Sequence, residues 1–199
     1  MGDDHPTLEA SSEHFLKHPD CFKHCLIGSL LSFVPIANIF ALGYLYRFSK
    51  ELRLQKAFNF PSWNDWGKLF IQGLVFLGFN LVFIGLPLFV SWIVKHLLLL
   101  LSFTLMGFMA NLPITLATFV GPALCISALF RYHETKSFRS LLSIKPILKP
   151  LLDHWPKTLL SSLCLLGFMA VLAPLYAVAS FVGYAFFIYY LAGVLRSDT

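Results

Sequence analysis

Long apolar runs alternate with short polar stretches along the chain from Cys21 onward. The run that begins at Ser32 has a Pro-x-x-Asn break near its start, continues through Gly43 and Tyr44, and ends in basic residues at Arg53. An apolar segment with aromatic residues near its end, followed by basic residues, is typical of a transmembrane helix that stops at a cytoplasmic surface. The pattern therefore predicts an all-α fold, and specifically a polytopic transmembrane helical protein.

Pro35 interrupts the first membrane unit, which covers residues 21–56. Proline removes a backbone donor and clashes with the preceding turn, so the helix must kink or break there. One interpretation is a single kinked span from Cys25 to Phe48, and the other is a hairpin of a short helix and a longer one. Asn38 is a candidate to satisfy the backbone groups that such a break would free.

Residues 1–20 are polar and form a predicted N-terminal arm ahead of a membrane domain that covers residues 21–199. Glycine and proline near the start disfavour an early helix. We therefore expect a partly disordered arm in which Ser12 caps a short helix through Lys17. The arm has no apolar core of its own, so we expect no cleavable signal peptide.

The segment 57–68 is too short and too polar to span a membrane. A helix is predicted to begin near Trp66, capped by Ser62 or Asn64, with an acidic residue favourable at its positive end. The tryptophans suit the headgroup layer, where an indole N–H stays hydrated; a docking surface for another subunit is the alternative. The interfacial or partner-binding candidates are Trp63, Asp65, Trp66 and, further along the chain, Trp155.

The central region, 69–131, is almost wholly apolar. Breaks at Gly85-Leu86-Pro87 and Asn111-Leu112-Pro113 predict three pieces, at roughly 69–84, 88–110 and 113–130. Lys95 and His96 lie inside the middle piece, where a buried lysine costs about 2.5–3.5 kcal/mol. We therefore expect Lys95 near a membrane interface, and the middle piece is a candidate for a break there. The pair either lines a proton or anion path or is an interfacial pair.

Basic residues gather in the polar stretches, as the positive-inside rule requires of cytoplasmic loops. The cytoplasmic candidates are Arg47, Lys50, Arg53, Arg131 and Arg139. If every basic patch is cytoplasmic, the chain between Lys68 and Arg131 crosses the membrane an even number of times, which conflicts with three pieces. One piece must then be re-entrant or split at Lys95. We expect five to seven apolar segments, arranged as short hairpins that alternate with interfacial helices.

Residues 132–157 return to a polar character, with apolar positions mainly on one helical face and charged positions on the other. A helix with this pattern lies in the membrane surface. Pro146 and Pro150 exclude one straight helix over the whole stretch. A C-terminal hairpin over residues 158–196 follows, divided near Pro174.

This C-terminal hairpin resembles an earlier part of the chain. Residues 105–112 and 165–172 share the pattern Leu-x-Gly-Phe-Met-Ala-x-Leu, and residues 119–123 and 181–185 share Phe-Val-Gly-x-Ala. Each copy ends at an arginine, Arg131 or Arg196, and residues 33–47 form a weaker third copy. Duplication of a helix hairpin, as in transporters built from repeats, is the favoured interpretation. The alternative is that the two stretches match by chance, because both are built from the same few apolar residue types.

Composition supports a membrane protein. Of 199 residues, 57% are hydrophobic and 13% are charged, whereas soluble proteins are about 45–50% apolar and about 25% charged. Lipid must therefore solvate most of the chain. The net charge of +5 lies in separate patches and not on one continuous basic face, which argues against nucleic-acid binding. The 4 cysteines suggest no framework of extracellular disulfides.

One cluster of candidate metal ligands precedes and enters the first apolar run. His14, His18, Cys21 and Cys25 are spaced so that a helix would place all four on one face. Histidine and cysteine are the natural ligands of zinc and copper. Pro19 would disturb such a helix, and the spacing matches no standard zinc finger. The alternative is a hydrated arm whose cysteines enter the membrane.

Other polar residues carry weaker signals. His133, Glu134 and His154 border the surface stretch, but no nucleophile, metal spacing or phosphate loop accompanies them, so they predict no active site. Ser49 has no partner motif and is interpreted as a solvated residue at the foot of the first unit. The sequence contains no catalytic motif and requires no cofactor.

Two motifs resemble a known family. The run P-I-A-N-I-F-A-L-G-Y-L-Y-R and the later F-P-S-W-N-D-W-G-K-L-F-I-Q-G-L resemble a bacterial and archaeal membrane-protein family of unknown function (domain of unknown function four-zero-one-three, abbreviated DUF4013). The resemblance covers about Leu26 to Leu74 and is only a match of hydropathy beyond. It implies a polytopic helical fold and no assigned activity. The matching residues are Pro35, Asn38, Gly43, Tyr44, Arg47, Pro61, Trp63, Asp65, Trp66, Gly67 and Gly73.

These observations predict a multi-pass protein of the cytoplasmic (inner) membrane, in contact with the lipid bilayer and with other membrane subunits. A non-catalytic subunit or scaffold of a membrane complex is the first hypothesis. A small transporter or channel built on the duplicated hairpin is the alternative, and it predicts that Asn38, Asn80 and Asn111 converge at the hairpin breaks. A membrane enzyme that uses the histidine and cysteine arm is the third.

Overall fold

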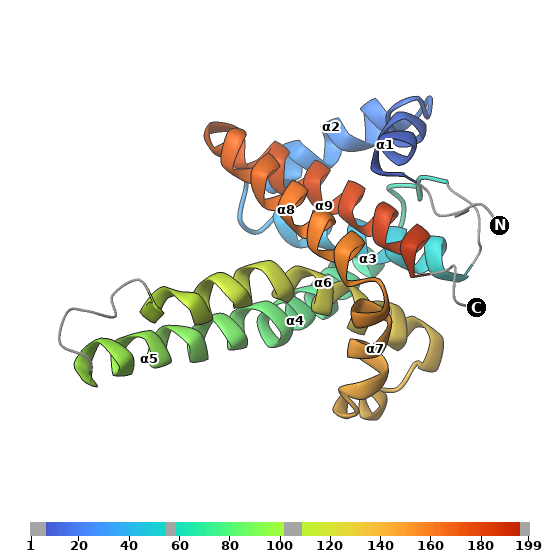
Figure 1. Ribbon diagram of the computed structural model, residues 1–199. Helices are drawn as coiled ribbons and strands as arrows, with labels where there is room; N and C mark the ends of the chain where they lie inside the picture. The colour runs from blue at the N-terminus through green and yellow to red at the C-terminus, as the bar shows by residue number, and fades with distance from the viewer. Residues whose placement is uncertain (1–6, 55–58, 102–108, 196–199) are drawn as a thin grey trace.

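The computed structural model describes residues 7–54, 59–101 and 109–195, which form helices and connecting turns with no strand (Figure 1). Residues 1–6 of the predicted arm, residues 105–108 of the repeat and Arg196 lie outside these ranges. The elements are α1 (Leu8–Leu16), α2 (Cys21–Ser32), α3 (Asn38–Leu54), α4 (Trp66–Asn80), η1 (Leu81–Gly85), α5 (Leu86–Leu101), η2 (Met109–Asn111), α6 (Leu112–Thr135), η3 (Phe138–Leu142), α7 (Lys145–Asp153), α8 (Trp155–Val171), η4 (Ala173–Leu175) and α9 (Tyr176–Val194).

Two short hairpins, α2–α3 and α8–α9, build a body from which a longer hairpin extends as an arm (Figure 1). The chain turns between Ser32 and Asn38, so Pro35 separates two helices. The hairpin interpretation of the first unit is thereby confirmed, and the single kinked span is wrong. Within the body, α2 packs against α9, and α3 packs against α4, where the arm begins.

The arm consists of α4, η1 and α5 on one side and α6 on the other (Figure 1). Helix continues without a break from Trp66 through the predicted break at 85–87, and also through Lys95. The Leu86 N–H donates to the Leu81 carbonyl in the π-helical turn η1. Proline cannot donate a backbone hydrogen bond, and the wider turn before it accommodates this loss. Pro87 therefore lies in the first turn of α5 and does not end the helix.

The predicted division of the central region into three pieces is therefore wrong. The described residues between Lys68 and Arg131 form two long helical rods, which pack against each other. Two rods return the chain to the end of the arm where it started. The conflict between an odd number of pieces and basic residues at both ends disappears with this correction.

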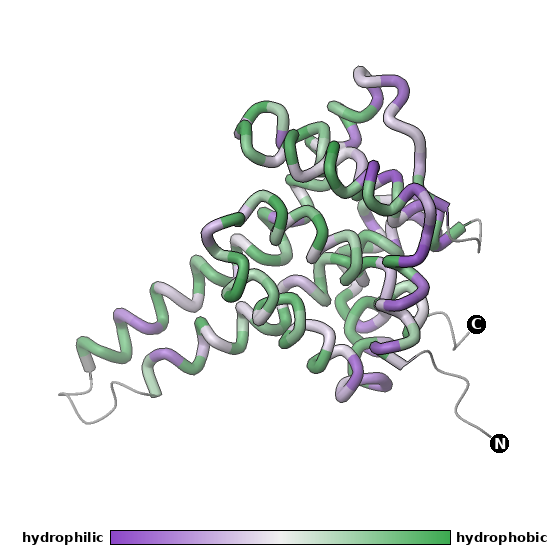
Figure 2. Tube along the Cα trace, turned by 90° about the horizontal axis from the view of Figure 1, so that it is seen from above, coloured by the Kyte–Doolittle hydropathy of each residue, from purple (hydrophilic) through white to green (hydrophobic). Residues whose placement is uncertain are grey.

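Within residues 7–54, 59–101 and 109–195, three stretches are long and apolar enough to cross a membrane: Trp66–Leu100, Met109–Thr135 and Ala173–Val194. Two further apolar helices, α2 and α8, are shorter. The described part of the chain is thus all-α with three candidate spans, and the expected count of five to seven is not confirmed. Hydrophilic positions gather at the end of the molecule where α7 lies and reappear near the far end of the arm (Figure 2).

Residues 7–20 of the N-terminal arm are more ordered than the sequence predicted. Thr7 caps α1, with its hydroxyl accepting from the Ala10 N–H at 3.3 Å, so the prediction of Ser12 as the cap is wrong. Phe15 is buried among aromatic rings that include Phe60 and Phe186. Burial of this one large side chain fixes α1 to the body.

Candidate functional site

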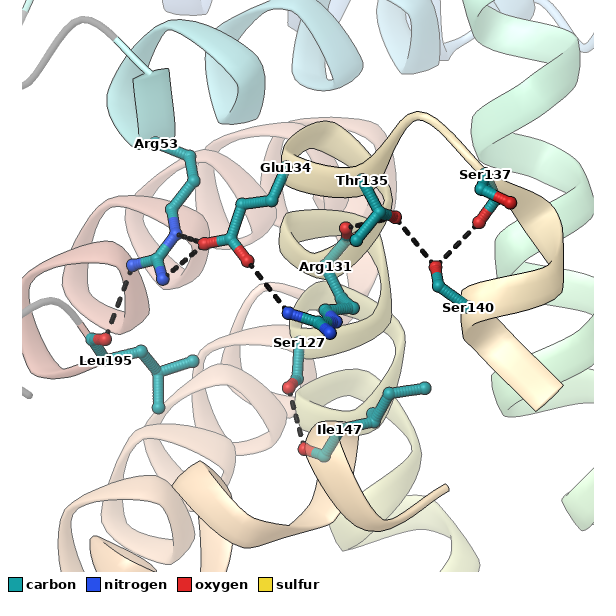
Figure 3. Close-up of polar contacts among 9 residues, drawn as sticks. All are labelled: Arg53, Ser127, Arg131, Glu134, Thr135, Ser137, Ser140, Ile147 and Leu195. Atoms are coloured by element: carbon teal, nitrogen blue, oxygen red, sulfur yellow. Dashed lines mark hydrogen bonds and ion pairs between the residues drawn. The ribbon is translucent and has the colours of Figure 1, made fainter. Parts of the chain in front are cut away.

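A cluster of charged residues lies where α3, α6 and α9 end together at the base of the arm (Figure 3). Arg53 Nε and Nη2 contact Glu134 Oε1 at 2.7 and 2.6 Å, and Arg53 Nη1 donates to the Leu195 carbonyl at 3.3 Å. Arg131 Nη1 lies 3.6 Å from Glu134 Oε2. One carboxylate therefore holds two guanidinium groups, one from α3 and one from its own helix.

Helix α7 completes a pocket around this cluster. The pocket has a volume of about 350 Å³ and is lined by Arg53, Ser127, Phe130, Arg131, Glu134, Pro146, Lys149, Pro150, Asp153 and Leu195. The Ser127 hydroxyl donates to the Ile147 carbonyl at 2.8 Å, which ties α7 to α6. Lys149 and Asp153 are exposed, so the pocket opens to the surroundings.

The local sequence explains why the chain turns here. Lys136 ends α6 in the left-handed conformation with φ 51°, and its N–H donates to the Tyr132 carbonyl. Thr135 then bonds to the hydroxyl of Ser140 at 2.7 Å, and Ser140 donates to the Ser137 carbonyl at 2.6 Å (Figure 3). These local hydrogen bonds set the turn that carries η3 and α7 back toward the pocket.

A second polar contact joins the same two helices in the interior. Ser49 Oγ of α3 lies 2.9 Å from His133 Nε2 of α6, and both side chains are buried. Ser49 also donates to the Tyr46 carbonyl at 2.8 Å. The prediction that Ser49 is a solvated residue is wrong. Because the pair is closed to solvent and substrate, it acts as a clamp between helices and not as a nucleophile with its base.

The two family motifs meet in the structure. Arg47 Nη1 donates to the carbonyls of Ser62 and Asn64 at 3.0 and 3.1 Å, which holds the 59–65 loop against α3. The Trp63 ring stacks on Tyr44 with centroids 4.1 Å apart. Arg47 thus holds a loop. The contact with Ser62 spans fifteen positions of the chain, and no local sequence pattern predicts it.

Close helix crossing explains two of the motif glycines, Gly43 and Gly73. A Cβ on Gly43 would overlap the Leu69 carbonyl, and a Cβ on Gly73 would overlap the Ile39 carbonyl. Only glycine allows the backbones of α3 and α4 to approach this closely. The motif therefore builds the joint between the body and the arm.

The tryptophan segment begins the arm as the sequence predicted, because α4 starts at Trp66. The predicted cap is wrong: Asp65 occupies the N-cap position with φ 59° and makes no capping hydrogen bond. Its carboxylate instead pairs with Lys68 at 3.0 Å. Trp66 and Trp155 are exposed, as are Lys50 and Arg139.

Trp63 differs from the other tryptophans because its indole nitrogen is buried. Trp63 Nε1, Tyr44 Oη and His24 Nδ1 are all buried without a hydrogen-bond partner among the residues that the structure describes, and the three rings stack on one another. Burial lowers the pKa of His24, an effect that Asp20 partly opposes. Trp66 is exposed, whereas the buried indole nitrogen of Trp63 does not fit the expected hydrated indole.

The predicted metal ligands make other contacts. His14 Nδ1 lies 2.9 Å from the Tyr189 hydroxyl, and His18 Nδ1 accepts from the Asp20 N–H. The Sγ atoms of Cys21 and Cys25 are 3.9 Å apart, and burial raises the pKa of Cys25 to about 12. Within the described ranges, no three His, Cys, Asp or Glu residues are placed to hold a metal ion. Metal binding by these four residues stays a prediction, which metal analysis of the purified protein would decide.

Comparison with known proteins gives one result. A family model described as protein of unknown function (DUF4013) matches residues 27–188. No curated protein and no solved structure matches. The match extends the resemblance from the two motifs to most of the helical domain, including the arm and the residues that line the charged pocket except Leu195. The chain therefore belongs to the DUF4013 family.

Proposed function

We propose that this protein is a non-catalytic membrane subunit or scaffold of the cytoplasmic membrane, anchored by its arm. One observation carries the proposal: the helix Trp66–Leu100 is 35 residues long, yet only 17% of its most apolar stretch is buried within the protein. Such a surface is unstable in water and stable in hydrocarbon. Lipid, or the helices of a partner, must cover the arm.

The length of the arm supports an orientation across the bilayer. A rise of about 1.5 Å per residue separates Lys95 from Lys68 by about 40 Å along the helix. The hydrocarbon core is about 30 Å thick, so Lys95 and His96 would emerge in the opposite headgroup layer. His96 contacts Trp92, with ring centroids 4.3 Å apart, as suits an interfacial pair.

An apolar groove beside the arm supports contact with a partner helix. The groove has a volume of about 370 Å³ and lies between the arm and η3. Gly78 lines it with open space where a Cβ would be. Small residues at membrane interfaces let a second helix approach closely. The groove is lined by Val75, Gly78, Phe79, Val82, Phe83, Phe138 and Leu141.

Purification in a mild detergent tests the proposal. We expect another membrane protein to purify with the chain, and Gly78→Leu to reduce its recovery because leucine fills the groove. Gly67→Leu, a change at another unfilled glycine of α4, is the matched control and should leave recovery unchanged. A chain that purifies alone and moves solute in liposomes would overturn the scaffold proposal.

A small transporter is the second candidate function, and one observation favours it. Asn38 and Asn80 line a common cavity of about 80 Å³ inside the body, together with Ser32, Ser180 and Tyr184. The Tyr184 hydroxyl donates to Asn80 Oδ1 at 3.4 Å. Two of the three asparagines expected near the hairpin breaks thus converge. Asn111 is exposed on the arm and does not line this cavity.

The favoured hairpin duplication also stays a proposal. Residues 165–172 lie at the end of α8, and the later halves of the two copies fall within α6 and α9. Each of these helices follows a short 3₁₀ turn, η2 or η4. Similar placement supports a common origin, although the arm is much longer than the α8–α9 hairpin.

A further inference from the structure

We propose that the pocket between α3, α6 and α7 binds a phosphoryl group, of the kind carried by an anionic phospholipid. The inference concerns a ligand and goes beyond the scaffold role, because it holds with or without a partner subunit. It rests on the charges of the pocket, on an unpartnered group in its wall, and on its level along the arm.

The lining residues carry a surplus of one positive charge. Arg53, Arg131 and Lys149 are cations, and Glu134 and Asp153 are anions. Glu134 is shared between the two arginines, so it cannot neutralise both. A phosphodiester carries a single negative charge, which matches this surplus better than a multiply charged anion would.

Arg131 is the residue with unused capacity. Arg53 makes two contacts to Glu134 and one to the Leu195 carbonyl. Among the described residues, the Arg131 side chain makes one longer contact, to Glu134, and its Nε is buried without a hydrogen-bond partner. The side chain as a whole is 39% exposed, so a ligand can reach it. A buried donor left unpaired costs about 1–3 kcal/mol. Phosphate oxygens are the acceptors that a guanidinium fork fits best, since two parallel N–H groups can bind two oxygens.

The position of the pocket indicates the source of the phosphoryl group. Arg131 lies four residues before the end of the candidate span Met109–Thr135, where a helix enters the headgroup layer. On α7, Ile147 and Leu151 are buried, whereas Leu152 is 58% exposed. Leu152 lies on the same face as Lys145 and Lys149, seven and three residues along the helix. A short helix that exposes a leucine beside its lysines fits the membrane surface. Basic pockets at this level bind anionic lipid headgroups.

Lipid binding by the full chain in a neutral detergent tests the inference. Native mass spectrometry would count bound lipids, and thermal unfolding would report stabilisation. The probes are phosphatidylglycerol, phosphatidylcholine with the same acyl chains, and glycerol phosphate without chains. We expect phosphatidylglycerol to bind and stabilise, and phosphatidylcholine to bind at least about tenfold more weakly because its choline cancels the charge that the pocket selects.

Two variants connect binding to the pocket. Arg131→Gln and Lys149→Gln should each weaken phosphatidylglycerol binding by about tenfold, which corresponds to about 1.4 kcal/mol. Lys149 is exposed, so its variant folds even if Arg131→Gln does not. Lys145→Gln, on the same helix but outside the pocket lining, is the matched control and should bind normally.

Each outcome is decisive. Stabilisation by glycerol phosphate alone, with the same dependence on Arg131 and Lys149, would support a phosphoryl site and identify a soluble ligand as its source. Stabilisation by phosphatidylglycerol alone would identify the lipid. Equal binding by the wild type, the two pocket variants and the control would overturn the inference, as would the absence of binding by any probe.

Discussion

The arm and the last helix of the body are similarly apolar but have different surroundings. Of the most apolar stretch of each, 17% is buried in Trp66–Leu100 and 61% in Ala173–Val194. Helix α9 contains small buried residues, including Ala177, Gly183 and Ala185. The helix Trp66–Leu100 contains no alanine, and Gly73 is the only one of its glycines that is buried. Small residues allow helices to pack closely, and large ones suit lipid. Hydrophobicity alone therefore predicts insertion, and residue size predicts which helices pack together.

The largest expected effect lies at the joint between these two regions. Gly73→Ala should destabilise the protein by more than about 3 kcal/mol, because the new Cβ would overlap the backbone of α3. Gly78→Ala, on the same helix with open space, should be neutral or stabilising by up to about 1 kcal/mol. Thermal unfolding in detergent measures both. Equal effects would show that α3 and α4 do not cross closely.

Large aromatic residues provide a direct comparison of the body with the arm. Phe187 of α9 is 2% exposed and Phe89 of α5 is 59% exposed. Phe187→Ala should cost about 3–5 kcal/mol because it leaves a cavity in the core. Phe89→Ala should change the unfolding free energy by less than about 0.5 kcal/mol in detergent. A large loss for Phe89→Ala would mean that the arm packs on protein.

The charged cluster should contribute less than the core. Glu134→Gln removes the carboxylate that joins α3 to α6, and its side chain is 34% exposed. We expect a loss of about 1–3 kcal/mol in unfolding free energy, typical of hydrogen bonds to charged groups. Glu13→Gln, in an exposed pair on α1, is the control, with an expected change of at most about 0.5 kcal/mol. Similar values for the two variants would contradict the proposed role of Glu134.

The sequence predicted local features better than distant contacts. The separation of two helices at Pro35 follows from the proline rule, which depends on neighbouring residues. Helix α4 also starts at Trp66 as predicted, although its predicted cap is wrong. The contacts of Ser49 with His133 and of Arg53 with Glu134 join residues more than eighty positions apart. Helical periodicity carries no information on such pairs. The lone acid in the basic stretch 131–136 was the only hint of the second.

The π-helical turn at Leu81–Gly85 explains the main error in the predicted fold. A Gly-Leu-Pro sequence usually ends a helix, and the three-piece prediction followed from that rule. A single wide turn before Pro87 accommodates the missing N–H and the ring of the proline, so the helix continues without a break. The same sequence thus allows two outcomes, and packing of η1 against α6 accompanies the continuous helix.

The smallest expected effect depends on pH. Burial lowers the pKa of His24 below its usual value near 6.5, so the unfolded chain binds a proton more readily than the folded one. Stability should therefore fall as the pH drops below about 6.5, by at most about 1.4 kcal/mol per pH unit for this group. His24→Phe should reduce the loss between pH 7.5 and 5, measured by thermal unfolding. His96→Phe, on the exposed part of the arm, should leave the loss of stability between pH 7.5 and 5 unchanged.

The orientation of the arm tests the central claim most directly. In a chain whose four native cysteines are replaced by alanine, single cysteines at His96 and Lys136 would be labelled with a membrane-impermeant maleimide in intact cells. The account predicts labelling at position 96 from outside, and at position 136 only after the membrane is opened. Labelling of both positions from the same side would contradict an arm that crosses the bilayer.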